Sequence, residues 1–176
     1  NRNPLSREYV RTLADGYEAL ADRKGYQSIR GFRPNASGFT IIGMSGVGKS
    51  TAVEKILSLY PQCIEHSCYC GQLLMVTQLV WLKLDCPHDG SIKGLCFQFF
   101  DAVDRATGTD YFPRYTKARY TVDVLMVLMT QLVNLYQIGI LIIDEIQHLS
   151  LAKGGGSEKM LNFFVTLVNT IGIPVV

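Results

Sequence analysis

The residues with the clearest chemical potential lie in the stretch 43–51, which reads Gly-Met-Ser-Gly-Val-Gly-Lys-Ser-Thr. The stretch fits the pattern G-x-x-x-x-G-K-[ST] at every fixed position. Backbone N–H groups at the start of a helix can surround a triphosphate, and glycines let the backbone approach the phosphate oxygens without a Cβ clash. We expect Lys49 to reach the β- and γ-phosphates and the Ser50 hydroxyl to complete the oxygen shell of Mg²⁺. The residues predicted to bind the nucleotide are Gly43, Ser45, Gly46, Val47, Gly48, Lys49, Ser50 and Thr51.

Two acidic residues, Asp144 and Glu145, directly follow the apolar run Ile140–Ile143. Such a run is typical of a strand buried on both faces of a parallel sheet, and α/β folds bind ligands at the carboxyl ends of these strands. We expect Asp144 to hold Mg²⁺, directly or through water, and Glu145 to act as the general base on an attacking water. The alternative is that Asp144 only caps a following helix.

The glycine-rich stretch could be a phosphate-binding loop or only a turn with an incidental lysine, and the residues on either side of it distinguish the two interpretations. Residues 39–42 are β-branched or aromatic, which predicts a strand. Residues 50–57 carry apolar side chains at helical spacing, which predicts a helix. A strand, a glycine loop and a helix, in this order, are the context that the motif requires.

Composition limits the class of protein. The chain has 176 residues, 48% of them hydrophobic and 18% charged, which indicates one globular domain and excludes a disordered chain. A net charge of +2 is too small to argue for nucleic-acid binding, although a local basic surface is compatible with it. We find no apolar run of the ~18 residues that a membrane span needs and no signal peptide. The odd number of cysteines, five, favours free thiols in a reducing cytoplasm.

Periodicity and turn residues predict the other elements of the chain. We expect helices at about 6–22, 92–106, 121–136 and 157–171, a hairpin around 64–71 with Gly71 near its turn, and strands at 79–84 and from 173 onward. Ser91 and Ser157 stand where N-caps are expected. Because a buried strand should not stop after a few residues at the end of a finished domain, we expect the sequence to be a fragment of a larger protein.

A possible zinc site is formed by residues that cluster within a short stretch, namely Cys63, His66, Cys68 and Cys70. The two closest cysteines are separated by a single residue, and no second pair of ligands follows at a suitable spacing. The alternative is an ordinary strand of a hairpin.

Three further segments each admit two interpretations. His88 could touch phosphate or DNA, or stand in a solvated loop. Residues 108–119, expected to form a loop, interleave basic and aromatic side chains, which suits either contact with a nucleic-acid backbone or a half-buried loop. Residues 1–37 are polar and basic, and form either a helix packed on the edge of the domain or a border to the base and ribose of the nucleotide.

The order of the predicted elements resembles the core of an AAA+ ATPase, with roughly ninety-five residues between Lys49 and Asp144. Five blocks resemble the TnsC/TniB family, the AAA+ regulators of Tn7-like transposons: residues 42–51, 80–87, 108–111, 143–147 and 161–164. The phosphate loop and the acid pair are shared across AAA+ proteins. The blocks around Trp81, Gly108 and Asn162 are those that point to this family.

The resemblance implies an α/β fold, a P-loop NTPase of the AAA+ type with a parallel sheet flanked by helices and incomplete at the C-terminus. It divides the chain into an N-terminal helical and basic segment, 1–37, and an ATPase core, 38–176. It implies ATP and Mg²⁺ as cofactors, with Lys49 and Ser50 at the phosphates and Mg²⁺, Asp144 at Mg²⁺ and Glu145 as the hydrolytic base. The family's sensor residue, arginine finger and helical lid are expected beyond residue 176.

The resemblance also implies partners and a cellular role. Such proteins form a ring or filament around duplex DNA in the bacterial cytoplasm, bind ATP between subunits, and connect a target-selecting protein to the transposase. Two other interpretations remain open from the sequence. The chain could be another AAA+ machine, such as a helicase loader or a protein remodeller, or a nucleotide-gated adaptor in which hydrolysis is incidental.

Overall fold

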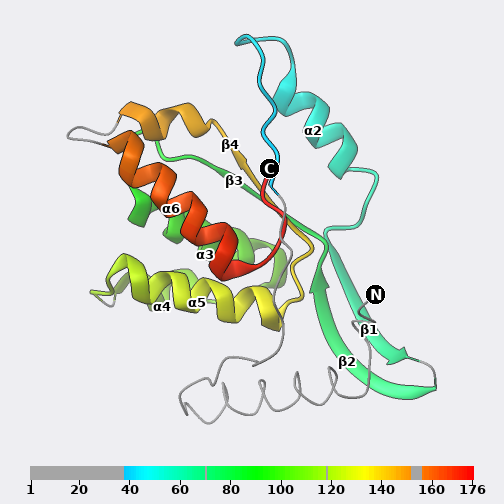
Figure 1. The fold of residues 1–176 in the computed structure, drawn as a ribbon. Coiled ribbons are helices and arrows are strands. Elements are labelled where there is room, and N and C mark those ends of the chain that lie inside the picture. The colour runs from blue at the N-terminus through cyan, green and yellow to red at the C-terminus, as the bar shows by residue number, and fades with distance from the viewer. Residues whose placement is uncertain (1–37, 70, 118, 152–155) are drawn as a thin grey trace.

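Two parallel strands form the centre of the fold, and the second of them ends at the acid pair (Figure 1). The computed structural model describes residues 38–69, 71–117, 119–151 and 156–176. Strand β3 (Trp81–Asp85) pairs in parallel with β4 (Ile140–Asp144), and the register places Asp85 beside Asp144. The expected strands at 79–84 and 140–143 are therefore confirmed, each with a small change in its bounds.

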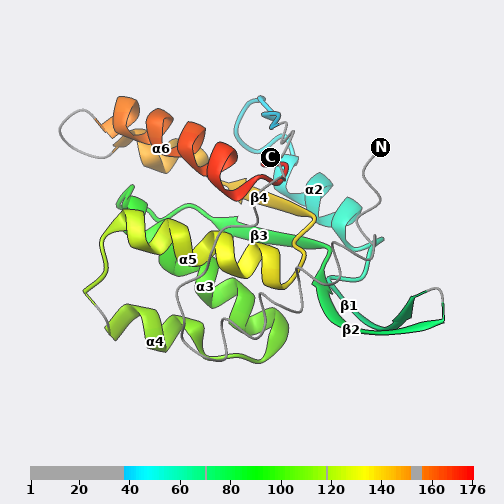
Figure 2. The same ribbon diagram turned by 60° about the horizontal axis from the view of Figure 1, so that its bottom comes forward.

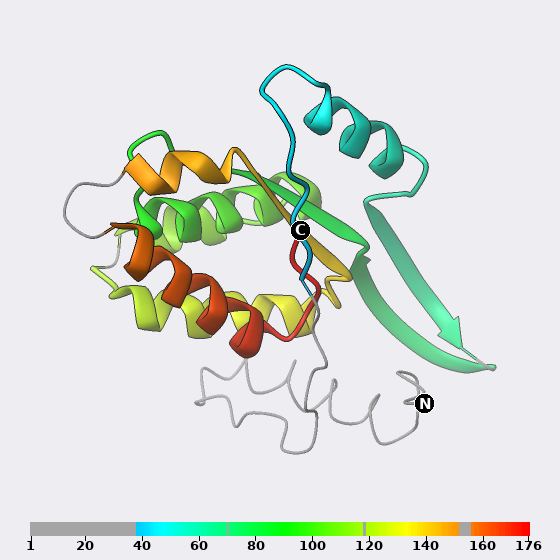
Figure 3. The same ribbon diagram turned by 45° about the horizontal axis from the view of Figure 1, so that its top comes forward.

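The chain end adds a further parallel segment beside β4. Val175 forms a β-bridge with Leu141, and the N–H of Ile143 donates to the Val176 carbonyl at 2.7 Å. On the far side of this segment, the Phe39 N–H donates to the Val175 carbonyl at 3.2 Å. The segment that leads into the glycine-rich loop therefore lies at the outer edge, next to the last residues of the chain (Figure 3).

The prediction of a regular strand at 39–42 is wrong in the structure, which has no assigned strand there. Among the described residues, a single backbone hydrogen bond, from Phe39 to Val175, joins the two segments, and Ile42 is 91% exposed. A strand needs a ladder of such bonds on at least one side. At Gly38 the two backbones do approach closely, since an added Cβ would lie 2.9 Å from the Val175 carbonyl oxygen.

The alternation of side chains along the strands sends two different sets of residues to the two faces of the sheet. Leu82 and Leu84 of β3 are buried, together with Leu141 of β4, in one core with helices α3 (Ile92–Thr107), α5 (Val122–Leu135) and α6 (Gly156–Ile171). The other face carries Lys83 and Asp85 and lies beneath helix α2 (Lys49–Leu57). Figure 2 shows α2 across the strands from α3 and α5.

The helix caps follow from local sequence. The Ser91 hydroxyl accepts a hydrogen bond from the Gly94 N–H at 3.1 Å, which confirms the N-cap expected for α3. Thr121 caps α5 in the same way. Helix α6 begins one residue before Ser157, the expected cap.

A β-hairpin projects from the body of the fold, as Figure 1 shows. Strands β1 (Cys63–Tyr69) and β2 (Gln72–Leu79) pair antiparallel, and Gly71 adopts a φ of +75° in the turn. The hairpin prediction is therefore confirmed. His66 lies within hydrogen-bond distance of the Gln78 side chain, 2.9 Å from its amide oxygen.

The metal interpretation of this hairpin gains no support. The described residues contain no group of three or more His, Cys, Asp or Glu side chains arranged to hold a metal, and Cys70 lies outside them.

The prediction of a loop at 108–119 is wrong, because residues 111–117 form helix α4 (Tyr111–Lys117). The cause is the carboxylate of Asp104 on the preceding helix. It accepts the N–H groups of Tyr111 at 2.8 Å and Phe112 at 2.7 Å, and the Thr109 hydroxyl at 2.7 Å. These are N–H groups that a helix leaves without an internal partner at its start, so a distant side chain satisfies them.

The aromatic side chains of α4 pack inward. The Tyr115 ring lies 4.9 Å from that of Phe100, and the Tyr111 hydroxyl lies 3.1 Å from that of Tyr136. Burial, with the nearby Tyr136 hydroxyl, raises the pKa of Tyr111 above its ordinary value. Of the basic side chains, Arg114 pairs with Asp110 at 2.8 Å. Residues 1–37, including the expected helix at 6–22, lie outside the described residues.

Candidate nucleotide-binding site

The glycine-rich loop joins the edge segment to helix α2 through two left-handed residues. Gly46 has a φ of +79° and Gly48 a φ of +90°, a region that residues with a Cβ rarely adopt. At Gly43 the structure shows a different constraint, since an added Cβ would lie 3.4 Å from the Val47 side chain. The expected turn chemistry is therefore present at two of the three glycines. Ser45 and Val47 are exposed in the loop, and Thr51 is exposed in the first turn of α2.

The Lys49 side chain folds back over its own loop. Its ammonium donates to the carbonyl oxygens of Gly43 at 2.9 Å and Met44 at 3.0 Å. These carbonyls hold the ammonium at the mouth of the loop, where the motif needs a positive charge. To bind a phosphate, the ammonium exchanges carbonyl oxygens for phosphate oxygens.

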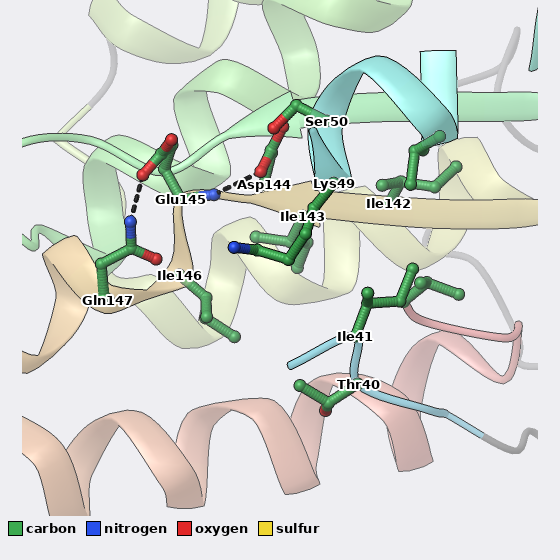
Figure 4. Close-up of a pocket in the computed structure, with 12 residues that line it drawn as sticks. Thr40, Ile41, Lys49, Ser50, Ile142, Ile143, Asp144, Glu145, Ile146 and Gln147 are labelled. Atoms are coloured by element: carbon green, nitrogen blue, oxygen red, sulfur yellow. Dashed lines mark hydrogen bonds between the residues drawn. The ribbon is translucent and has the colours of Figure 1, made fainter. Parts of the chain in front are cut away.

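The start of α2 and the end of β4 bring Ser50 and Asp144 together, as Figure 4 shows. The Ser50 hydroxyl lies beside the Asp144 carboxylate and helps to lower the pKa of that group. The Glu145 N–H donates a hydrogen bond to this carboxylate at 2.9 Å, and the Lys83 ammonium lies 3.3 Å away. Burial by itself raises the pKa of Asp144, but these partners outweigh it and hold the pKa below its ordinary value.

A carboxylate that stays ionised beside a hydroxyl oxygen is the kind of donor set that a hard divalent cation prefers. Asp144 and Ser50 would supply two oxygen ligands, and the remaining positions suit water and phosphate oxygens. Asp144 accepts a hydrogen bond from the Glu145 N–H, as it would if it only capped the following turn. Its contacts with Ser50 and Lys83, however, join it to two other elements of the fold, which a cap does not require.

Glu145 occupies an unusual backbone conformation directly after β4. Its φ is +55°, in the left-handed region that is uncommon for residues other than glycine. Its carboxylate accepts a hydrogen bond from the Gln147 side chain and lies 3.6 Å from Nε2 of His148. In Figure 4 this carboxylate turns toward Gln147, and that of Asp144 turns toward Ser50. Left-handed outliers of this kind are concentrated at functional sites.

These groups surround an open pocket at the carboxyl edge of the strands (Figure 4). It is lined by Thr40, Ile41, Lys49, Ser50, Val53, Ile142, Ile143, Asp144, Glu145, Ile146, Gln147 and Val176. The sequence-predicted acids and the Lys49–Ser50 pair thus line one cavity, although ninety-five residues separate Lys49 from Asp144 in the sequence.

Sequence reasoning missed Lys83, which contacts the centre of this site. It stands between Leu82 and Leu84 in strand β3, and its ammonium bonds Glu54 of α2 at 2.6 Å. The available signal was the lysine itself, because a charged residue in a central strand needs a partner. His88 packs its ring against that of His148, with centroids 4.6 Å apart, so the loop after β3 touches the segment after β4.

Comparison with protein families agrees with this arrangement. The model of an AAA domain family matches residues 33–176. The chain belongs to the AAA domain family. Comparison with curated proteins gives no match.

Membership of the AAA domain family supports a P-loop NTPase fold with ATPase activity, because such domains generally hydrolyse ATP. The parallel strands, the glycine loop and the acid pair of this AAA domain are consistent with that activity. None of the described helices is both long enough and apolar enough to span a membrane.

Proposed function

We propose that this AAA domain binds ATP with Mg²⁺, hydrolyses it, and uses the nucleotide cycle to regulate DNA transposition. The observation that carries the nucleotide part is the meeting of the Ser50 hydroxyl and the Asp144 carboxylate beside Lys49 and Glu145. A phosphate loop supplies the binding half of the chemistry, and the acid pair supplies the cation-binding and proton-accepting half.

Each residue has a distinct task in this proposal. The loop N–H groups and the Lys49 ammonium bind and orient the phosphates, so their negative charge is matched before the reaction begins. Ser50 and Asp144 would hold Mg²⁺, which when bound neutralises charge on the phosphate oxygens. Glu145 would leave its bond to Gln147 and accept a proton from the attacking water.

The transposition part is supported by the sequence blocks that resemble the TnsC/TniB family. Two of these blocks carry contacts of this fold. The Trp81 indole donates to the Tyr60 carbonyl at 3.2 Å, which ties the segment after α2 to β3. Gly108 ends α3 with a φ of +73°, and the residues after it bond Asp104. By this resemblance the protein would assemble as a homo-oligomeric ring or filament on duplex DNA, in the bacterial cytoplasm, and link a target-selector protein to the transposase.

Sedimentation tests the proposal directly. The protein is examined with a non-hydrolysable ATP analogue and Mg²⁺, with and without duplex DNA, beside a Lys49→Met variant that keeps the fold but loses the phosphate contact. We expect large assemblies only when nucleotide and DNA are both present, and none from the variant.

Other outcomes favour other functions. Assembly that needs nucleotide but ignores DNA would favour a protein remodeller. DNA-dependent assembly without binding to a transposase would favour a helicase loader. Assembly that follows nucleotide binding, and is unaffected when turnover is blocked, would favour a nucleotide-gated adaptor. A protein that assembles under none of these conditions would contradict the oligomeric regulator while leaving the nucleotide site in place.

A further inference from the structure

Lys83 places one positive charge among three carboxylates. Its ammonium lies 2.6 Å from Oε1 of Glu54, 3.3 Å from Oδ2 of Asp144 and 3.8 Å from Oδ1 of Asp85. The side chains of Lys83 and Asp144 are 18% and 22% exposed, so water screens this pair only partly, whereas Glu54 and Asp85 are exposed. The three acids come from three elements, namely α2, β3 and β4.

These contacts close a ring around the candidate cation site. Ser50 and Glu54 are four residues apart on α2, which puts them on the same face of the helix. Ser50 lies next to Asp144, Asp144 contacts Lys83, and Lys83 bonds Glu54. Helix α2 buries none of its own side chains, so this polar ring is a main link between the phosphate-loop helix and the sheet.

The charges explain what the ring does to a divalent cation. Three carboxylates within 4 Å of one point would attract a cation strongly if nothing neutralised them. The ammonium offsets part of this negative charge, and the described residues contain no cluster of three acidic, His or Cys side chains suited to a metal. Ser50 and Asp144 then supply two oxygen ligands, and the phosphates of a nucleotide must supply others.

We propose that Lys83 is a built-in counter-ion that keeps divalent cations away from this edge until a nucleotide brings phosphate oxygens, and that it holds Asp144 facing Ser50. This role rests on the proposed assignment of Asp144 as a cation ligand. Lys83 is therefore a positioning residue that makes cation binding conditional on nucleotide binding.

The test is binding of Mn²⁺ alone, without nucleotide, followed by the loss of the free Mn²⁺ signal in electron paramagnetic resonance. The wild-type protein is expected to bind Mn²⁺ negligibly. Lys83→Met is expected to bind it at least about tenfold more tightly, because a unit positive charge next to the cation is gone. Lys83→Arg keeps the charge and should match the wild type.

A matched control is Lys55→Met, which removes the same charge from an exposed lysine of helix α2. It should bind Mn²⁺ no better than the wild type, whereas a general effect of net charge would affect both variants equally. Lys83→Gln is tested in parallel and should behave like Lys83→Met, with circular dichroism to establish that each variant is folded.

Two results would overturn the inference. One is substantial binding of Mn²⁺ alone by the wild type, which needs no variant to observe. The other is a folded Lys83→Met or Lys83→Gln protein that binds Mn²⁺ no better than Lys55→Met. Failure of the proposed function looks different, because the wild type would then bind no ATP analogue in the presence of Mn²⁺, whatever the variants do without nucleotide.

Discussion

The left-handed backbone of Glu145, directly after β4, is predicted to destabilise the folded protein. Its φ of +55° costs a residue with a Cβ roughly 1–2 kcal/mol relative to the right-handed region. Glycine adopts this conformation without strain, but it makes the unfolded chain more flexible, which lowers the free energy of unfolding by about 0.5–1 kcal/mol. We therefore expect Glu145→Gly to unfold with a free energy about 0.5–1 kcal/mol higher than Glu145→Ala.

The comparison of these two variants isolates the backbone, because both lack the carboxylate and its bond to Gln147. Urea unfolding at neutral pH gives the free energies, and the melting temperatures should differ by about 2–4 °C for each kcal/mol in a chain of this size. Both variants should bind an ATP analogue and lack turnover, since neither retains the proposed base.

Gln137 provides an internal control. It also has a positive φ, +47°, and lies just after α5, away from the phosphate loop. Gln137→Gly should likewise be more stable than Gln137→Ala, but both should keep their ATPase activity. Equal stabilities for the Glu145 pair, with the expected difference for the Gln137 pair, would refute a left-handed Glu145 in solution.

Two further predictions concern the acid pair and helix α4. Glu145→Gln should keep ATP binding but lower turnover by roughly 10²–10⁴-fold in a phosphate-release assay. It should also hold the protein in its assembled state. Normal disassembly of this variant would show that ATP hydrolysis does not control disassembly. Asp104→Asn should lower the free energy of unfolding by about 1–3 kcal/mol and speed hydrogen exchange in α4, because one charged acceptor of three hydrogen bonds is lost. The matched change Asp101→Asn, which breaks only the exposed pair with Arg105 at 3.1 Å, should cost less than about 1 kcal/mol, and equal losses for the two variants would contradict the anchoring role of Asp104.

Local features of the fold were predictable because their causes lie within a few residues. Gly46 and Gly48 permit the left-handed turns of the loop, and Ser91 caps helix α3. The apolar run before Asp144 marks a buried strand, and its end marks the edge where ligands bind. The family match then agrees with the coarse class inferred from these motifs.

Contacts between distant segments were not predictable, and they account for the errors. Helix α4 forms because the Asp104 carboxylate, seven residues before Tyr111, accepts the first N–H groups of that helix. Residues 39–42 form no regular strand, since the backbone hydrogen bond of Phe39 depends on where Val175 lies. Propensity describes a segment in isolation, whereas these outcomes depend on a partner that the segment does not contain.

The sequence by itself determined which groups are available for chemistry: the loop glycines, the Lys49 ammonium, the Ser50 hydroxyl and the Asp144–Glu145 pair. Tertiary structure alone decided which of these groups meet and in what charge environment. The register of β3 on β4 aligns Asp85 with Asp144, and the position of α2 over the strands brings Glu54 to Lys83. The physical reason is that hydrogen bonds and ion pairs act over a few ångströms, so only the packed chain decides which distant residues come within reach.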